Sequence, residues 1–212
     1  MNTKERGFLI AIEGIDGSGK TTLLKILENY FQKKEISVFA LPSGGFSPLD
    51  VEAQIRKIVV AENSGISKET ETLLYISGLA QKVGQYIEPA LKRNKVVIID
   101  RFLLSTLVLV CCMNGLEKTF AENILEYASN GLKPDFTFLC DIDEDIAYSR
   151  MISRGQPLSR REKKGQPLMR VLRKGFLDMI SSTTDKFEII DTGHTSIEEL
   201  EECIGIIDQY VK

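Results

Sequence analysis

The sequence predicts an α/β fold in which a five-stranded parallel sheet carries helices on both faces. Short β-branched or aromatic runs alternate along the chain with segments whose apolar residues recur at helical spacing. The strand candidates show little alternation of apolar and polar residues, which is typical of parallel strands buried on both faces. With 212 residues, 43% of them hydrophobic, the chain is long enough to enclose such a core as a single domain over residues 1–212.

Five short segments are predicted as strands, in chain order 8–13, 37–41, 96–100, 136–140 and 187–190. Eight segments with helical apolar spacing are predicted as helices, at about 21–34, 49–61, 68–93, 103–113, 116–130, 144–153, 166–181 and 196–211. Folds of this kind bind ligands at the carboxyl ends of their strands. We therefore expect the chemistry just after Glu13, Leu41, Asp100 and Cys140.

A phosphate-binding motif follows the first predicted strand. Residues 14–21 complete the pattern G-x-x-x-x-G-K-[ST] between a strand and a helix, the context that this motif requires. Its glycines let backbone N–H groups surround an oxyanion, and the helix N-terminus adds positive potential. We expect Lys20 to reach the β- and γ-phosphates of ATP and the Thr21 hydroxyl to bind Mg²⁺. The predicted ATP-binding residues are Gly14, Ile15, Asp16, Gly17, Ser18, Gly19, Lys20, Thr21 and Thr22. The alternative interpretation of residues 14–21 is an ordinary glycine-rich turn between a strand and a helix, without a role in phosphate binding.

A second group of candidate site residues, Asp100 and Arg101, lies at the end of the third predicted strand. The apolar run 96–99 leads into Asp100, the arrangement with which phosphate-loop enzymes hold Mg²⁺ opposite the loop hydroxyl. Helix capping is the alternative role for this aspartate. Arg101 follows, and its guanidinium can either grip a phosphate through two hydrogen bonds or pair with Asp100. The sequence thus predicts Thr21 and Asp100 as metal-site residues, beside an acceptor that is itself a phosphate ester.

Basic side chains gather after the fourth predicted strand. They are Arg150, Arg154, Arg160, Arg161, Lys163, Lys164, Arg170 and Arg173. Interspersed glycines and prolines predict a mobile flap, the lid segment at about 150–167, that closes over polyphosphate and excludes water. We expect Arg154 and Arg160 to bring positive charge to the transferring phosphoryl group, and Lys163 and Lys164 to lie on the solvated surface.

Composition excludes several classes of partner. A formal net charge of −3 and a pI near 5.4 argue against binding of a nucleic-acid polymer. The four cysteines have neither C-x-x-C spacing nor a histidine cluster, so we expect reduced thiols and no zinc site. The first seven residues are polar and charged, and no apolar run approaches the length of a membrane span. We expect a cytoplasmic protein that acts on small molecules.

These motifs resemble those of the thymidylate kinase family of nucleoside monophosphate kinases, over nearly the entire chain. The matching segments are 10–22 (opening motif), 100–102 (aspartate-arginine-aromatic signature), 159–162 (lid motif, with Ser for Asp) and 190–193 (before the last helix). The resemblance implies the nucleoside monophosphate kinase version of the P-loop NTPase fold. It also implies transfer of the γ-phosphoryl group of ATP, with Mg²⁺, to a nucleoside monophosphate such as dTMP.

The resemblance further assigns acceptor-binding residues. Arg56 lies where the family has an arginine that holds the acceptor phosphate together with Arg101, and Asp16 where a loop aspartate organises metal and acceptor. Tyr75 lies where an aromatic ring stacks on the thymine, with core packing as the alternative. In this interpretation the catalytic residues are Lys20, Asp16, Asp100, Arg154 and Arg160.

Three departures from the family pattern concern base recognition. Leu79 stands where an arginine usually hydrogen-bonds the base, Leu41 begins the segment that replaces Arg-Glu-Pro, and Leu109 belongs to a replaced polar pair. Loss of hydrogen-bonding groups lowers discrimination between substrates. We therefore expect phosphoryl transfer from ATP, with an acceptor that need not be dTMP.

Two other functions stay open on the sequence. One is a kinase of a nucleoside or of another small phosphorylated metabolite, and the other is an ATP-binding paralogue with a regulatory role. Family members also commonly dimerise. The apolar run 103–110 is either a contact in such a homodimer or a buried core helix.

Overall fold

The computed structural model describes residues 6–43, 46–47, 50–61 and 65–211. Its strands form one parallel sheet in the order β2-β3-β1-β4-β5. They are Leu9–Glu13 (β1), Val38–Leu41 (β2), Val96–Asp100 (β3), Phe136–Asp141 (β4) and Phe187–Asp191 (β5). The predicted α/β fold with five parallel strands is confirmed, and every predicted strand boundary lies within one residue of the observed one.

Helices follow the predicted order along the chain. They are Lys20–Lys33 (α1), Val51–Val60 (α2), Lys68–Lys82 (α3), Glu88–Leu91 (α4), Leu103–Val108 (α5), Lys118–Ala128 (α6), Glu144–Ser153 (α7), Gly165–Ser181 (α8) and Ile197–Ile204 (α9). The helix predicted at 68–93 is interrupted by a π-helical turn at Val83–Ile87, and another, Leu109–Met113, extends α5. The last predicted helix ends as a 3-10 helix, Gly205–Gln209. Residue 49, where α2 was expected to begin, lies outside the described residues.

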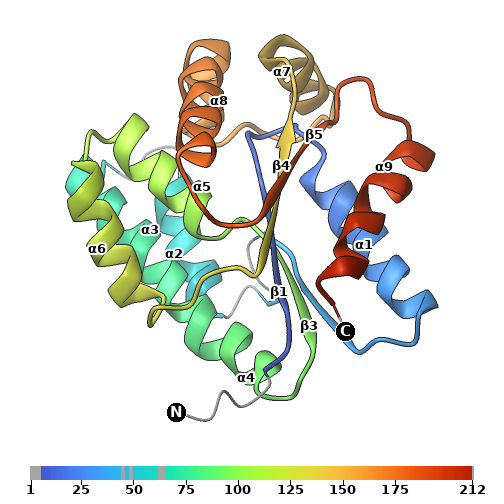
Figure 1. Ribbon diagram of the computed structural model, residues 1–212. Helices are drawn as coiled ribbons and strands as arrows, with labels where there is room; N and C mark the ends of the chain where they lie inside the picture. The colour runs from blue at the N-terminus through green and yellow to red at the C-terminus, as the bar shows by residue number, and fades with distance from the viewer. Residues whose placement is uncertain (1–5, 44–45, 48–49, 62–64, 212) are drawn as a thin grey trace.

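Apolar side chains cover both faces of the sheet. Helices α1 and α9 lie on one face and α3, α5 and α6 on the other (Figure 1). Leu27 and Phe31 of α1 belong to the same buried cluster as Ile10 and Ile98 of the central strands. All residues of β1 and β3 are buried, which explains why these strands lack alternation of apolar and polar residues.

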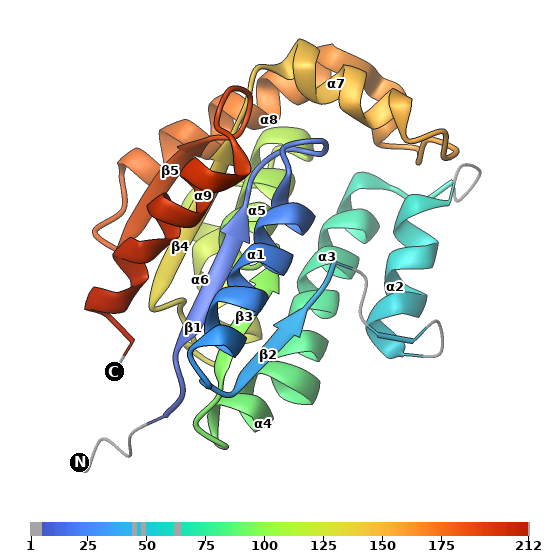
Figure 2. The same ribbon diagram turned by 90° about the vertical axis from the view of Figure 1, so that its right-hand side faces the viewer.

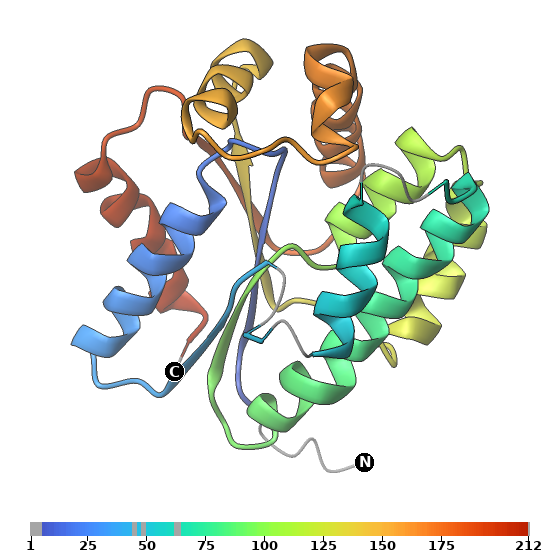
Figure 3. The same ribbon diagram turned by 180° about the vertical axis from the view of Figure 1, so that it is seen from behind.

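The strands direct their carboxyl ends towards α7. Figure 2 shows β1, β2 and β3 pointing to that end of the molecule, whereas both chain termini lie at the other. Seen from behind, α2 and α3 lie side by side on the face away from α1 and α9 (Figure 3). At that end the loops after β1 and β3 are in contact, because Arg101 binds Gly14 and Asp16.

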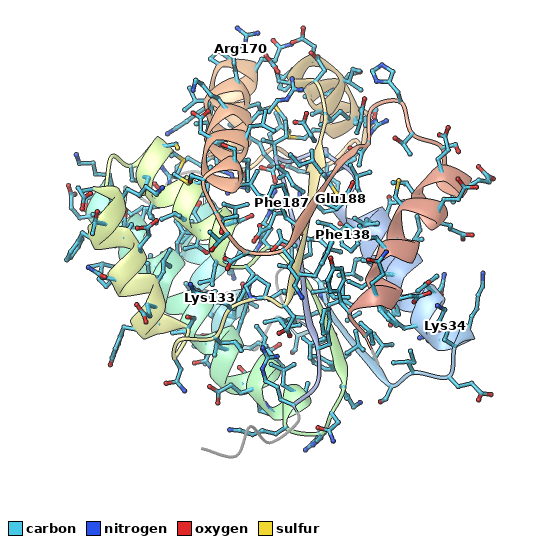
Figure 4. All side chains as sticks on the ribbon, in the orientation of Figure 1. Lys34, Lys133, Phe138, Arg170, Phe187 and Glu188 are labelled. Atoms are coloured by element: carbon cyan, nitrogen blue, oxygen red, sulfur yellow. The ribbon has the colours of Figure 1, made fainter. Side chains whose placement is uncertain are left out.

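Ion pairs join α7 and α8. Arg173 binds Asp141 through two nitrogens at 2.8 and 2.9 Å, and it also pairs with Glu144. Arg170 lies at the outer end of α8 (Figure 4). It pairs with Glu144 at 2.6 Å. These two arginines of the basic segment thus hold two helices together rather than facing the loop after β1.

The apolar run 103–110 packs inside the chain. None of its side chains is exposed, because α5 lies against α6 and α8. The core-helix alternative accounts for this run, and the homodimer stays a prediction. Cys111, Cys112, Cys140 and Cys203 are free thiols. None of the helices in the described part of the chain has the length and apolar character needed to cross a membrane.

Candidate active site

The phosphate loop joins β1 to α1, and two of its glycines are required by their surroundings. Gly14 and Gly17 have φ values of 136° and 83°, which side chains of L-residues rarely allow. A Cβ atom would lie 2.4 Å from the Cys140 carbonyl oxygen at Gly14, and 2.3 Å from that of Ala147 at Gly17. The loop therefore packs its backbone directly against β4 and α7.

Lys20 is the first residue of α1, and its side chain turns back into the loop. Its Nζ donates to the Ile15 carbonyl at 2.5 Å and to the Ser18 hydroxyl at 3.4 Å. Burial, together with the nearby charge of Arg101, lowers the pKa of Lys20 to about 8. The loop is also tied to the segment after β5, where the Thr192 hydroxyl donates to the Ser18 carbonyl at 2.9 Å. The ammonium is thus held inside the loop, as a phosphate-binding lysine requires.

Thr21 and Asp100 meet across the site, as the sequence predicts for a metal position. The Thr21 hydroxyl donates to Asp100 Oδ2 at 3.2 Å. Asp100 is 3% exposed, and its Oδ1 has no hydrogen-bond partner among the described residues. A buried carboxylate oxygen without a partner beside a hydroxyl fits Mg²⁺, which takes one or two protein oxygens and completes its shell with water and substrate phosphates. The described residues contain no cluster of three or more His, Cys, Asp or Glu that would hold a metal alone.

Arg101 connects β3 to the phosphate loop. It adopts φ 70°, a left-handed conformation that costs a residue with a side chain about 1 to 3 kcal/mol. Three hydrogen bonds hold it there, from its Nη1 to the Gly14 carbonyl (2.7 Å) and the Ser105 hydroxyl (3.2 Å), and from its Nη2 to Asp16 (2.6 Å). Strained backbone of this kind is typical of functional sites.

Arg101 and Arg161 both donate hydrogen bonds to Asp16 of the phosphate loop. Asp16 accepts from Arg101 at Oδ1 and from Arg161 at Oδ2, at 2.6 and 2.7 Å. Burial by itself would raise the pKa of Asp16, but the two guanidinium groups outweigh it and hold the pKa well below its usual range. Asp16 is therefore ionised near neutral pH.

Glu13, which the sequence analysis did not single out, positions the segment after β3. Its buried carboxylate accepts from the backbone N–H groups of Phe102 (3.0 Å) and Ser105 (3.1 Å) and from the Ser105 hydroxyl. Burial raises the pKa of Glu13. Since Arg101 lies just before these anchored residues, Glu13 fixes where the Arg101 guanidinium can reach.

The arginines of the lid segment differ in their surroundings and in the residues that they contact. Arg154 ends α7 and is exposed, with no ion pair to any residue that the structure describes. Arg160 is paired with Glu71 of α3, and its guanidinium lies 3.4 Å from the Val59 carbonyl of α2. Arg161 reaches Asp16. The structure thus brings neither Arg154 nor Arg160 to the loop, and the roles expected for them stay predictions.

A cavity of about 70 Å³ opens beside Arg101. The three predicted acceptor residues, Arg56, Tyr75 and Arg101, all line it, and so does Arg161, for which no acceptor role was predicted. Its remaining lining includes Ser43, Glu52, Ile55, Gly78, Leu79, Lys82, Thr106 and Leu109.

The apolar departures from the family pattern divide between the cavity and the core. Leu79 and Leu109 are cavity residues, as expected from their places in the sequence. Leu41, the last residue of β2, is fully buried in a core cluster and does not line the cavity. The expectation that Leu41 marks a base contact is therefore not supported by its position.

Comparison with known proteins gives a consistent result. The family model for thymidylate kinase matches residues 12–204. The thymidylate kinase of Symbiobacterium thermophilum is 33% identical over 92% of this chain and 89% of its own length. Those of Thermoanaerobacter sp. (strain X514) and Finegoldia magna are 32% and 33% identical over 97% and 93% of this chain, and 100% and 96% of their own lengths. With the phosphate loop, Asp100 and Arg101 assembled at one edge of the sheet, the chain belongs to the thymidylate kinase family, a family of nucleoside monophosphate kinases.

Proposed function

We propose that this protein transfers the γ-phosphoryl group of ATP to a nucleoside monophosphate, with dTMP as the first candidate acceptor. The position of Arg101 is the observation that carries the proposal. Its guanidinium bonds the phosphate loop at Gly14 and Asp16 and also lines the cavity that holds Tyr75. One cation therefore lies between the donor loop and the acceptor cavity, where an acceptor phosphate must meet the γ-phosphate.

On the donor side, the loop amides and Lys20 bind the phosphates of ATP. Thr21 and the unpartnered oxygen of Asp100 are the protein ligands offered to Mg²⁺. Bound there, the ion would neutralise charge on the β- and γ-phosphates. The buried Lys20 supplies positive charge from a site where water does not screen it.

On the acceptor side, Arg56 and Arg101 hold the phosphate and Tyr75 stacks on the base. No general base is needed, because the second pKa of a phosphate monoester is about 6 and the acceptor is already anionic near neutral pH. Leu79 and Leu109 give this cavity apolar walls. We expect weaker discrimination between pyrimidine bases than a pocket with matched polar partners would provide.

A steady-state assay of an acceptor panel with ATP and Mg²⁺ tests the proposal. The panel contains dTMP, dUMP, dCMP, dGMP, dAMP and unphosphorylated thymidine. We expect turnover of dTMP, with dUMP within about tenfold in kcat/KM, and no turnover of thymidine. Phosphorylation of thymidine but not of dTMP would favour a nucleoside kinase. ATP binding without turnover of any monophosphate would favour a regulatory protein.

A further inference from the structure

Arg161 lines the cavity beside Arg101, whereas Arg150, Arg154 and Arg160 of the lid segment do not. The Arg161 side chain is 15% exposed, and its Nη2 donates to Asp16 at 2.7 Å. Tyr75 lines the same cavity as Arg161. Arg160, the residue before it, pairs instead with the buried Glu71 of α3 and does not line the cavity. Adjacent arginines thus serve two purposes: one docks the segment on α3, and the other enters the cavity.

Arg161 and Arg101 approach the same carboxylate from two sides. Each donates to a different oxygen of Asp16, at 2.7 and 2.6 Å. Two buried cations therefore share one anion beside the cavity, which leaves positive charge for a second anionic group. The Nε of Arg161 is buried and has no partner among the described residues, so the guanidinium keeps one unsatisfied hydrogen-bond donor.

We propose that Arg161 is an acceptor-binding residue carried by the lid segment, which holds a phosphate oxygen of the nucleoside monophosphate between Arg101 and Tyr75. The inference rests on the proposed function and adds a residue to it. Docking of the lid segment then completes the acceptor site, and the base and the phosphate are both engaged only when the segment is in place.

The surroundings of Arg161 favour the acceptor over ATP. Its side-chain hydrogen-bond partner is Asp16, and it lines the cavity together with Arg56 and Tyr75. Lys20, which marks the donor phosphates, directs its Nζ to Ile15 and Ser18 inside the loop. A guanidinium at this position can bind phosphate in a bidentate manner, whereas a lysine would offer a single point charge.

The test uses the full-length protein with Arg161→Ala, Arg161→Gln and Arg161→Lys. The matched control is Lys164→Ala, which removes one exposed positive charge from the same segment. Three quantities are measured for each variant: the KM for dTMP, the KM for ATP, and the Kd for dTMP by calorimetry without ATP. The ion pair between Arg160 and Glu71 remains in every variant, so the segment keeps its docking contact.

We expect Arg161→Ala to raise the KM and Kd for dTMP about 10- to 100-fold, the effect of losing a hydrogen bond to a charged group, with the KM for ATP changed less than about twofold. Arg161→Lys should fall between Ala and wild type, and Lys164→Ala should match wild type. Should the alanine variant fail to fold, Arg161→Gln, which keeps most of the side-chain volume without the charge, is expected to show the same loss.

Two results would overturn the inference while leaving the proposed function intact. One is unchanged dTMP affinity in the Ala and Gln variants, which would make Arg161 a structural tie between lid and loop. The other is a rise in the KM for ATP alone, which would place Arg161 on the donor side. A wild-type protein inactive with every monophosphate would overturn the proposed function, and the inference with it.

Discussion

Among single residues, Lys20 has the environment that bears most directly on ATP binding. It is buried in the phosphate loop, and burial lowers its pKa to about 8. Replacement by alanine removes a preorganised charge from the transferring phosphates. We predict a loss of about 10²- to 10³-fold in kcat for Lys20→Ala, measured by steady-state kinetics with ATP and dTMP. Activity within a few-fold of wild type would contradict this role.

The lowered pKa of Lys20 also predicts a pH dependence of ATP binding. Bound phosphates favour the protonated amine, so above pH 8 binding must take up a proton, and affinity falls as pH rises. The limit for one proton is about tenfold per pH unit. The affinity is measured as a function of pH by calorimetry with a non-hydrolysable ATP analogue between pH 7 and 10. Lys20→Arg, which stays charged over this range, should remove the break near pH 8 even if it binds more weakly.

Among the elements, the joint between β1 and α5 depends on Glu13. Its carboxylate accepts two backbone hydrogen bonds and one from the Ser105 hydroxyl. In Glu13→Gln an amide NH₂ replaces one acceptor oxygen and faces N–H donors. We predict a loss of about 1 to 3 kcal/mol in the free energy of unfolding, measured by urea denaturation. Glu202→Gln, on the exposed face of α9, is the control and should leave stability within error.

The lid segment and α3 are joined by the ion pair between Arg160 and Glu71. The sequence predicts that Arg160 serves the transferring phosphoryl group, and the structure has it on Glu71. If Arg160 leaves Glu71 to act in the transition state, Glu71→Gln will keep kcat near wild type while Arg160→Ala lowers it about 10²-fold or more. We expect this unequal result from rapid-mix kinetics. Equal losses in the two variants would show that Arg160 only holds the segment in place.

Much of the fold and part of the site could be predicted from the sequence. The strands were recognisable because parallel strands buried on both faces are continuous apolar runs, and the loop because its glycines have fixed spacing. The sequence could not predict which arginine of the lid segment lines the cavity and binds Asp16. Arg160 and Arg161 lie in an irregular turn without a periodicity that assigns sides. The role of Glu13 depends on N–H groups 89 and 92 positions away in the chain, a separation that no local pattern reports.

For the whole molecule, the family resemblance and the exposed apolar surface lead us to predict a homodimer. Leu73 on α3 and Phe120 on α6, two helices that pack together, are 59% and 55% exposed. Size-exclusion chromatography with light scattering should give about twice the chain mass of 23.8 kDa. Phe120→Asp should yield a monomer, whereas Ile197→Asp, equally exposed on α9 across the sheet, should not. A wild-type mass of one chain would contradict the prediction.

The chemistry of the whole molecule can be followed directly by ³¹P NMR of a mixture of ATP, Mg²⁺, dTMP and the protein. We predict that the γ-phosphate signal of ATP disappears as the β-phosphate signals of ADP and dTDP grow in equal amounts, and that Arg101→Ala abolishes this growth without abolishing ATP binding. Release of the γ-phosphate as inorganic phosphate, with dTMP left unchanged, would contradict it.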